Sequence, residues 1–137
     1  MNVKLFAVSA IVVLVVMFAF AATWHLVAFK ALYKRLAIYT RAEPIVPLGL
    51  TSMLIQALIF AYLFPVFAAG RQPLAAGLAF GLLMGVLMGS IGALAEAGKQ
   101  NVTSLPTFLT LESAFYLIQY SVLGVILGEL HGWLAET

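Results

Sequence analysis

Residues 77–97 have the sequence GLAFGLLMGVLMGSIGALAEA, in which a small residue falls at every fourth position. These small residues are Gly77, Gly81, Gly85, Gly89, Ala93 and Ala97. In a lipid bilayer, large apolar side chains do not drive helices together, whereas small residues let two helix backbones approach closely. The stretch therefore predicts a membrane-spanning helix that packs tightly against a second helix.

The composition of the whole chain also indicates a membrane protein. Of its 137 residues, 64% are hydrophobic and 9% are charged, whereas about 25% of the residues in a soluble domain are charged. The absence of cysteine excludes disulfides, thiolate nucleophiles and thiolate metal sites. No basic patch is interleaved with aromatic residues, so we expect no nucleic-acid partner. The length suits a single domain over residues 1–137.

Four apolar segments are each long enough to cross about 30 Å of hydrocarbon, which takes about 20 helical residues. We expect these spans at about 5–29, 45–64, 73–97 and 106–130. Prolines stand near the start of the last three spans, where the first turn of a helix tolerates them. Pro65 is expected to end the second helix or to kink its last turn. The predicted fold is an all-α integral membrane four-helix bundle.

The first apolar segment has an alternative interpretation as a signal peptide. Residues 1–21 contain a lysine, an apolar core and Ala19-Phe20-Ala21, which resembles a signal-peptidase site. The apolar run continues to Phe29, however, and a basic cluster follows it. These two features favour a retained membrane span.

Basic residues are distributed unequally between the two sides of the predicted bundle. One side carries Lys30, Lys34, Arg35, Arg41 and Lys99, and the other carries Lys4 and Arg71. Cytoplasmic loops of membrane proteins have an excess of lysine and arginine. We therefore expect a multi-pass membrane protein with both termini on the outer side.

The small residues of the third span have a counterpart in the fourth. The expected helix-packing residues are Gly77, Gly81, Gly85, Gly89, Gly92, Gly124 and Gly128. Because an α-helix turns about 100° per residue, the stripe drifts by about 40° for every four residues. A partner helix that crosses with right-handed geometry can follow its middle part. The stripe is expected to pack the third span on the fourth, to form a seam with a partner subunit or second copy, or to do both.

Polar groups at membrane depth are the candidate functional residues, because ionisable side chains in spans usually mark a function. The candidates for a proton or ligand site are Glu112, Glu96, His25, Gln56, Tyr116 and Gln119. Glu112 stands in the fourth span with Tyr116 and Gln119 on the same face. We expect His25, Ser52, Glu96 and Glu112 to lie in one layer of the cytoplasmic half.

Each of these groups also has a purely structural explanation. His25 beside Trp24 is typical of an aromatic belt at the membrane interface. Glu96 can lie at the interface beside Lys99, and Glu112 can pair with Lys99 or be stabilised by the helix dipole. Interhelical hydrogen bonds explain the two glutamines, Gln56 and Gln119, at about 0.6 kcal/mol each.

Three parts of the chain carry a resemblance to a known family. They are Ala22-Thr23-Trp24-His25 with the following 29–36 stretch, the glycine-rich span 77–92, and Glu112 with Phe115 and Tyr116. In these parts the chain resembles a family of bacterial four-span inner-membrane proteins that is known as a domain of unknown function. That family usually has tyrosine at the position of His25 and often aspartate at the position of Glu112. The resemblance implies four spans in the bacterial inner (plasma) membrane, where the outer side expected for both termini is the periplasmic side, and no particular chemistry.

The expected function is that of a non-enzymatic polytopic membrane protein. We expect an accessory or assembly subunit of a membrane complex that acts through helix–helix packing, because the residue spacings match no hydrolase, metalloprotease or phosphate-binding motif. An alternative is a small proton-coupled carrier or exporter that works as a homodimer with Glu112 as the proton site. No metal or cofactor is expected, although a haem, pigment or quinone near His25 and Trp24 is a further alternative.

Overall fold

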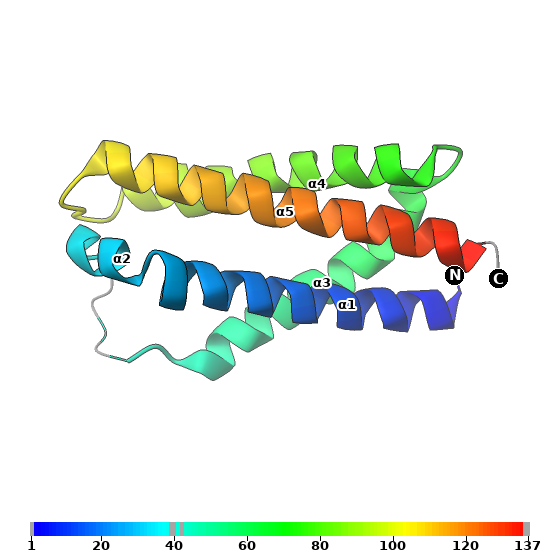
Figure 1. Ribbon diagram of the computed structural model, residues 1–137, viewed down its shortest axis with the longest axis horizontal. Helices are drawn as coiled ribbons and strands as arrows, with labels where there is room; N and C mark the ends of the chain where they lie inside the picture. The colour runs from blue at the N-terminus through cyan, green and yellow to red at the C-terminus, as the bar shows by residue number, and fades with distance from the viewer. Residues whose placement is uncertain (1, 39–40, 42, 136–137) are drawn as a thin grey trace.

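The computed structural model describes residues 2–38, 41 and 43–135 and is all-helical, with no strand in that part of the chain. Its elements in chain order are α1 (Val3–Ala22), η1 (Thr23–Ala28), α2 (Lys30–Leu36), α3 (Val46–Ala68), α4 (Pro73–Gly89), η2 (Ser90–Ala95) and α5 (Leu105–Ala135). η1 and η2 are π-helical turns that continue α1 and α4. Figure 1 shows the arrangement of the helices.

In the described residues, four helical stretches are long and apolar enough to cross a membrane. They are Val3–Ala28, Val46–Ala68, Pro73–Ala95 and Leu105–Leu134. The prediction of an all-α bundle with four spans is confirmed, and the architecture fits a polytopic membrane protein. Each span overlaps the segment that hydropathy predicts, with ends that differ by a few residues.

The structure excludes one of the two expectations for Pro65. The proline does not end the second helix, because α3 continues to Ala68 with Pro65 in its last turn. A proline in the last turn removes a single backbone hydrogen bond, which a membrane helix can replace by local adjustment. The basic cluster after the first span lies in a helix of its own, since Lys30–Leu36 forms α2.

Local capping explains where several elements begin and end. The side chain of Asn2 accepts a hydrogen bond from the backbone N–H of Leu5 at 3.2 Å and so caps α1. Gln72 caps α4 in the same way, with Pro73 in the first helical position. The turn before it contains Gly70 at a φ of +71°, a conformation that glycine adopts without steric cost.

The helices form two layers, visible in Figure 1. α4 and α5 run antiparallel side by side, and α1 lies below α5, with α3 crossing α1. The two chain ends lie together at one end of the bundle. The opposite end carries α2 and the turn between η2 and α5, and we call it the α2 end.

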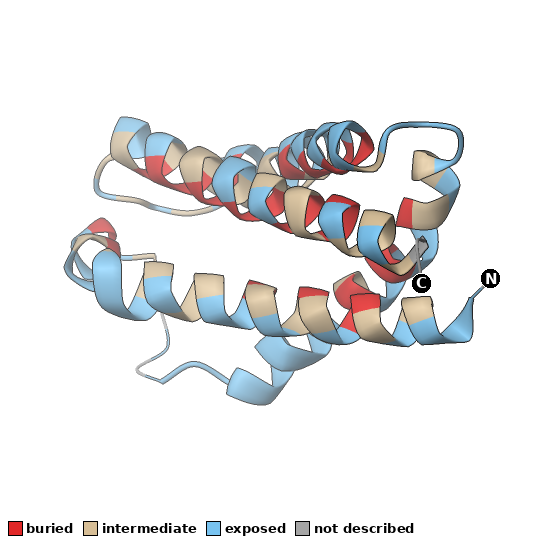
Figure 2. Ribbon diagram, turned by 45° about the vertical axis from the view of Figure 1, so that its right-hand side comes forward, coloured by how far each residue is buried: buried red, intermediate tan, exposed pale blue. Residues whose placement is uncertain are grey.

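α3 leaves the bundle toward the α2 end. Residues 46–52, its first two turns, are all exposed, whereas Ala57, Phe60, Ala61 and Phe64 are buried. Figure 2 shows the exposed first part of α3 in pale blue below α1. α3 therefore packs on the bundle along its second half and opens a gap beside α1 and α2.

Aromatic and aliphatic side chains from the four spans form the main core. Its buried members are Val13, Met17, Ala57, Phe60, Phe64, Phe80, Tyr120, Leu123 and Leu127. The ring of Phe80 from α4 lies edge-on to Phe60 and Phe64 of α3, with centroids 5.6 and 5.4 Å apart. A second, smaller core at the α2 end joins α2 to α5 through Tyr33, Leu36, Phe108 and Leu111.

Glycines bring α4 and α5 into close contact. A Cβ atom added to Gly81 would lie 3.0 Å from the Cα of Ser121 and 3.1 Å from that of Gly124. A Cβ on Gly77 would lie 3.0 Å from the Cα of Gly128. Real Cβ atoms rarely approach backbone atoms so closely, so only glycine fits at these positions without a shift of the helices. These contacts lie within one chain.

Toward the α2 end, the contacts of the glycine stripe change from backbone to side chain. Gly85 lies against the backbone of Tyr116 and Leu117, with 3.2 Å between an added Cβ and the Cα of Leu117. Gly89 and Gly92 lie under the ring of Tyr116. The space that these two glycines leave open is therefore filled by an aromatic side chain that points toward the α2 end.

Candidate functional site

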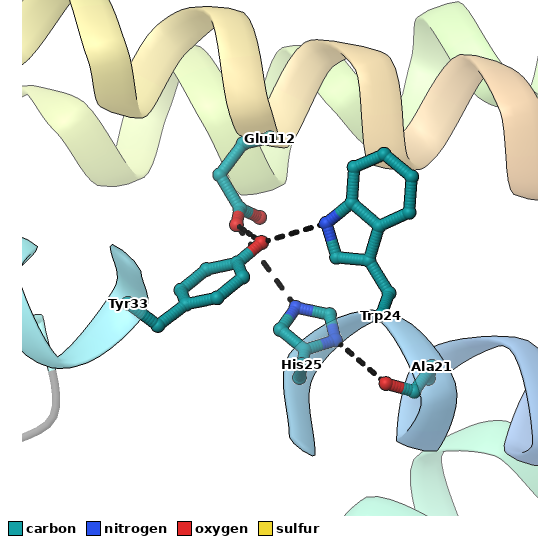
Figure 3. Close-up of polar contacts among 5 residues, drawn as sticks. All are labelled: Ala21, Trp24, His25, Tyr33 and Glu112. Atoms are coloured by element: carbon teal, nitrogen blue, oxygen red, sulfur yellow. Dashed lines mark hydrogen bonds and ion pairs between the residues drawn. The ribbon is translucent and has the colours of Figure 1, made fainter. Parts of the chain in front are cut away.

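Glu112, Tyr33, Trp24 and His25 form a polar cluster inside the α2 end, which we call the Glu112 cluster. Glu112 stands in the second turn of α5 and is 7% exposed. The hydroxyl of Tyr33, from α2, donates a hydrogen bond to Glu112 Oε1. Trp24 Nε1 of η1 donates to the same hydroxyl at 3.2 Å. As Figure 3 shows, the cluster joins three elements around one carboxyl group.

The orientation of His25 defines which of its nitrogens faces the carboxyl group. Its Nδ1 lies 3.0 Å from the carbonyl oxygen of Ala21, so Nδ1 carries a hydrogen and donates it. Its Nε2 lies 4.0 Å from Glu112 Oε1 (Figure 3). The ring is held between those of Tyr33 and Phe115, at centroid distances of 4.7 and 4.5 Å. His25 Nε2 therefore faces the Glu112 carboxyl group at ion-pair distance, without a direct hydrogen bond.

Both π-helical turns of the described chain border this cluster. η1 carries Trp24 and His25, and η2 carries Gly92 and ends next to Glu96. The backbone N–H of Phe29 donates to the carbonyl of Trp24 at 3.0 Å, a bond that spans five residues. π-helical turns are rare and occur frequently at functional sites. Two of them on different spans at one carboxyl group mark this position as a site.

A cavity of about 200 Å³ opens beside Glu112, and we call it the Glu112 cavity. Its lining residues are His25, Tyr33, Ile38, Gly92, Glu96, Gln100, Phe108, Glu112 and Tyr116. Most of these side chains are polar or aromatic. The volume suits a few water molecules, each of which takes about 30 Å³ in the liquid, or one small polar group.

Glu96 lines the same cavity as Glu112, but its carboxyl group is paired with a lysine. Lys99 Nζ lies 2.6 Å from Glu96 Oε1, and Gln100 Nε2 donates to Oε2 at 3.3 Å. These hydrogen bonds, the one from Lys99 first, lower the pKa of Glu96 below its ordinary value. Glu96 therefore stays ionised at neutral pH. The hypothesis that Glu112 pairs with Lys99 is wrong, because Lys99 pairs with Glu96.

The second-span polar residues form a separate contact. Gln56 Nε2 donates to Ser52 Oγ at 3.2 Å, and the hydroxyl of Tyr120 in α5 donates to Gln56 Oε1. This pair links α3 to α5 outside the Glu112 cavity. Of the four groups expected in one layer, His25, Glu96 and Glu112 line the Glu112 cavity, whereas Ser52 stands on the exposed first part of α3 and does not line it.

The remaining candidates divide between the cavity and the core. Tyr116 lines the Glu112 cavity. Gln119 is buried at 3% exposure and does not line it, and its Oε1 has no hydrogen-bond partner among the described residues. The seven candidate glycines lie along the α4–α5 contact.

Tyr33 is the member of the Glu112 cluster that sequence reasoning missed. It lies 79 positions from Glu112, in the basic stretch that follows the first span. A signal was available in the pattern: Tyr33 and Leu36 are three positions apart between basic residues, which places them on one face of a short amphipathic helix.

The Glu112 cluster does not suit a haem iron or another metal ion. No group of three or more histidine, aspartate, glutamate or cysteine side chains in the described residues could hold a metal. Both ring nitrogens of His25 face protein groups, since Nδ1 bonds Ala21 and Nε2 faces Glu112. An axial ligand would have to give up one of these contacts.

Two hydrogen bonds join the loop before α5 to the C-terminal end of α2. Thr103, just before α5, donates from its hydroxyl to the carbonyl of Arg35 at 2.8 Å and from its N–H to that of Leu36 at 3.3 Å. The loop that leads to Glu112 is thus fastened to the C-terminal end of the helix that carries Tyr33.

Comparisons of the chain with protein-family models, curated proteins and solved structures find no match.

Proposed function

We propose that the protein is a small non-enzymatic, proton-coupled carrier of the bacterial inner membrane in which Glu112 binds the proton. One observation carries the proposal: a buried carboxyl group faces a histidine nitrogen and a tyrosine hydroxyl where two spans have π-helical turns. Carboxyl groups inside membrane spans are costly and mark proton relays in pumps and transporters.

The geometry offers two arrangements for one proton. With Glu112 ionised, its oxygen accepts the hydrogen bond from Tyr33 and faces His25 Nε2. With Glu112 protonated, Oε2 can carry the hydrogen while Oε1 still accepts from Tyr33, so the carboxyl group loses its charge and gains a donor. Proton binding thus changes the charge and the hydrogen-bonding role of the group that faces His25, which is the kind of difference between two states that coupling requires.

The position of the cavity supports a route for the proton. The Glu112 cavity extends from Glu112 to Glu96 and Gln100, which stand at the end of the third span. The lysine-rich connections favour a cytoplasmic location for this end. A proton can therefore reach Glu112 from the cytoplasm along polar side chains. In the proposed carrier, two copies of the chain together move the proton and the substrate across the rest of the membrane.

The first test measures proton binding at Glu112 through Trp24. A Trp133→Phe background leaves Trp24 as the single tryptophan, since the chain has 2. Because Trp24 bonds Tyr33, we expect its emission to change with pH in the purified protein, and Glu112→Gln to abolish the change. Glu129→Gln, at an exposed position of the same helix outside the cavity, is the matched control and should keep it. If Glu112→Gln retained the full pH response, Glu112 would not be the proton site.

The second test measures transport. Proteoliposomes that contain trapped pyranine report proton movement when candidate substrates are added under an imposed pH gradient. We expect a substrate-dependent pH change that Glu112→Gln abolishes and that Glu129→Gln preserves, because Glu129 is exposed and lies outside the cavity. If Trp24 responded to pH but no substrate caused proton movement, the protein would sense protons without carrying them, and the carrier proposal would be contradicted.

A second candidate function is an accessory or assembly subunit of a membrane complex. The outer face of α4 favours it, because Leu78, Leu82 and Val86 are exposed there beside the small residues Ala75 and Ala79. Such a face suits a neighbouring membrane helix. Purification in mild detergent followed by mass spectrometry should then yield a stoichiometric membrane partner. Ala79→Trp should release this partner, and Glu112→Gln should not.

A further inference from the structure

A large groove lies between the first span with α2 and the first half of α3, and we call it the α1–α3 groove. Its volume is about 990 Å³. Its walls are mainly apolar, with Phe18, Ala21 and Leu26 on one side and Leu48, Leu50 and Met53 on the other. The groove exists because α3 stands away from the bundle over residues 46–52.

The charges on the groove all have the same sign. Lys30, Lys34 and Arg41 line it, and no aspartate or glutamate does so among the described residues. Lys30 and Lys34 are four positions apart on α2, so they project from the same helix face. Both are exposed, and neither has an ion-pair partner in the described part of the chain.

We propose that the α1–α3 groove binds an anionic phospholipid of the bilayer. The phosphate lies at Lys30 and Lys34, and an acyl chain lies between α1 and α3. The apolar walls belong to membrane-spanning segments, while the lysines follow directly on the end of the first span at Ala28. Basic pockets between membrane helices at the cytoplasmic surface bind anionic lipid headgroups in this way.

The groove adjoins the Glu112 cavity. His25, Tyr33 and Ile38 line both spaces, so a single layer of side chains separates them. The proposal does not depend on proton-coupled transport, because the lysines and apolar walls act without Glu112. A bound lipid would touch the side chains that hold the carboxyl group, and Trp24 would report its arrival through Tyr33.

The test titrates delipidated full-length protein with phosphatidylglycerol or phosphatidylcholine in detergent, with native mass spectrometry as the readout. We expect phosphatidylglycerol to bind more tightly. Lys30→Gln and Lys34→Gln should each weaken its binding about fivefold, and the double variant should weaken it about 25-fold. Arg35→Gln is the matched control, because Arg35 is exposed on the same helix but does not line the groove.

Two further variants separate the alternatives. A Cβ on Gly49 meets no atom within 4 Å, so Gly49→Leu extends into the groove and should weaken binding of both lipids without loss of fold. Glu112→Gln should bind lipid like the wild type, even if proton coupling fails. Equal affinity for the two lipids, or unchanged binding by the double lysine variant, would overturn the proposal. So would a dimer that Gly49→Leu dissociates, since a second copy would then occupy the groove.

Discussion

A single hydroxyl group, on Tyr33, connects three elements of the structure. It donates to Glu112 of α5 and accepts from Trp24 of η1, while α2 carries it. Its side chain is 1% exposed, so water cannot easily replace either bond. At the scale of one residue, the position of the Glu112 carboxyl group depends on this hydroxyl more than on any charge.

We therefore expect Tyr33→Phe to destabilise the protein by about 1–3 kcal/mol, because it deprives a buried carboxyl group of its donor and the Trp24 N–H of its acceptor. Tyr120→Phe is the matched control. It removes a hydrogen bond to the neutral side chain of Gln56, for which about 0.6 kcal/mol is typical in membranes. Reversible unfolding in mild detergent, followed by circular dichroism, measures both. Equal losses in the free energy of unfolding would show that the Tyr33 hydroxyl contributes no more than the Tyr120 hydroxyl.

At the scale of elements, the α4–α5 pair and the η1–α2 segment are built in opposite ways. Backbone contacts hold α4 against α5 along three turns of small residues, and such contacts leave little room for rearrangement. The η1–α2 segment contacts α5 through side chains, and it borders the Glu112 cavity. Its first part, η1, is a π-helical turn. We infer that α4 and α5 are the rigid part and that η1–α2 is the part that responds to a proton or a ligand.

The rigid pair should respond sharply to one methyl group. Gly81→Ala places a Cβ 3.0–3.1 Å from two Cα atoms of α5, and overpacking of this kind costs about 1–3 kcal/mol. In the control Gly132→Ala, the nearest atoms are side-chain carbons of Pro73 at 3.6 and 3.7 Å. Better helix propensity should then stabilise the protein by about 1 kcal/mol. Unfolding in mild detergent should show opposite signs for the two variants, and equal effects would contradict the contact.

At the scale of the whole molecule, the four spans place both chain ends on one side and the basic connections on the other (Figure 1). The α2 end gathers α2, the Glu112 cavity and the basic edge of the α1–α3 groove. If this end faces the cytoplasm, the proton site and the lipid site are both open to the same compartment and the same leaflet.

The orientation can be measured directly, because the chain contains no cysteine. Single cysteines at Ala69→Cys and Asn101→Cys stand at exposed positions in turns at opposite ends of the bundle. In intact cells we expect a membrane-impermeant maleimide to label position 69 and to label position 101 only after the membrane is opened. The reverse pattern would place the α2 end outside.

Hydropathy and proline positions were sufficient to predict the four spans, because a helix that crosses hydrocarbon must satisfy its backbone internally over a fixed length. Glycine spacing predicted which span would approach another backbone. The sequence indicated neither π-helical turn, since Trp24 and His25 in Thr23–Ala28 fit an α-helix as well as a π-helix. It also failed to connect Tyr33 with Glu112, because that contact arises from the folded path of the chain between two distant segments.

The attachment of Thr103 to the end of α2 has a consequence for the integrity of the protein. Together with the Tyr33–Glu112 hydrogen bond, this attachment fastens α1, η1 and α2 to α5 and to the loop before it. Neither contact depends on the peptide link between α2 and α3. A protease nick in that link should therefore leave the molecule whole. Fragments 1–41 and 42–137, made separately in the same cell, should assemble and purify as one particle.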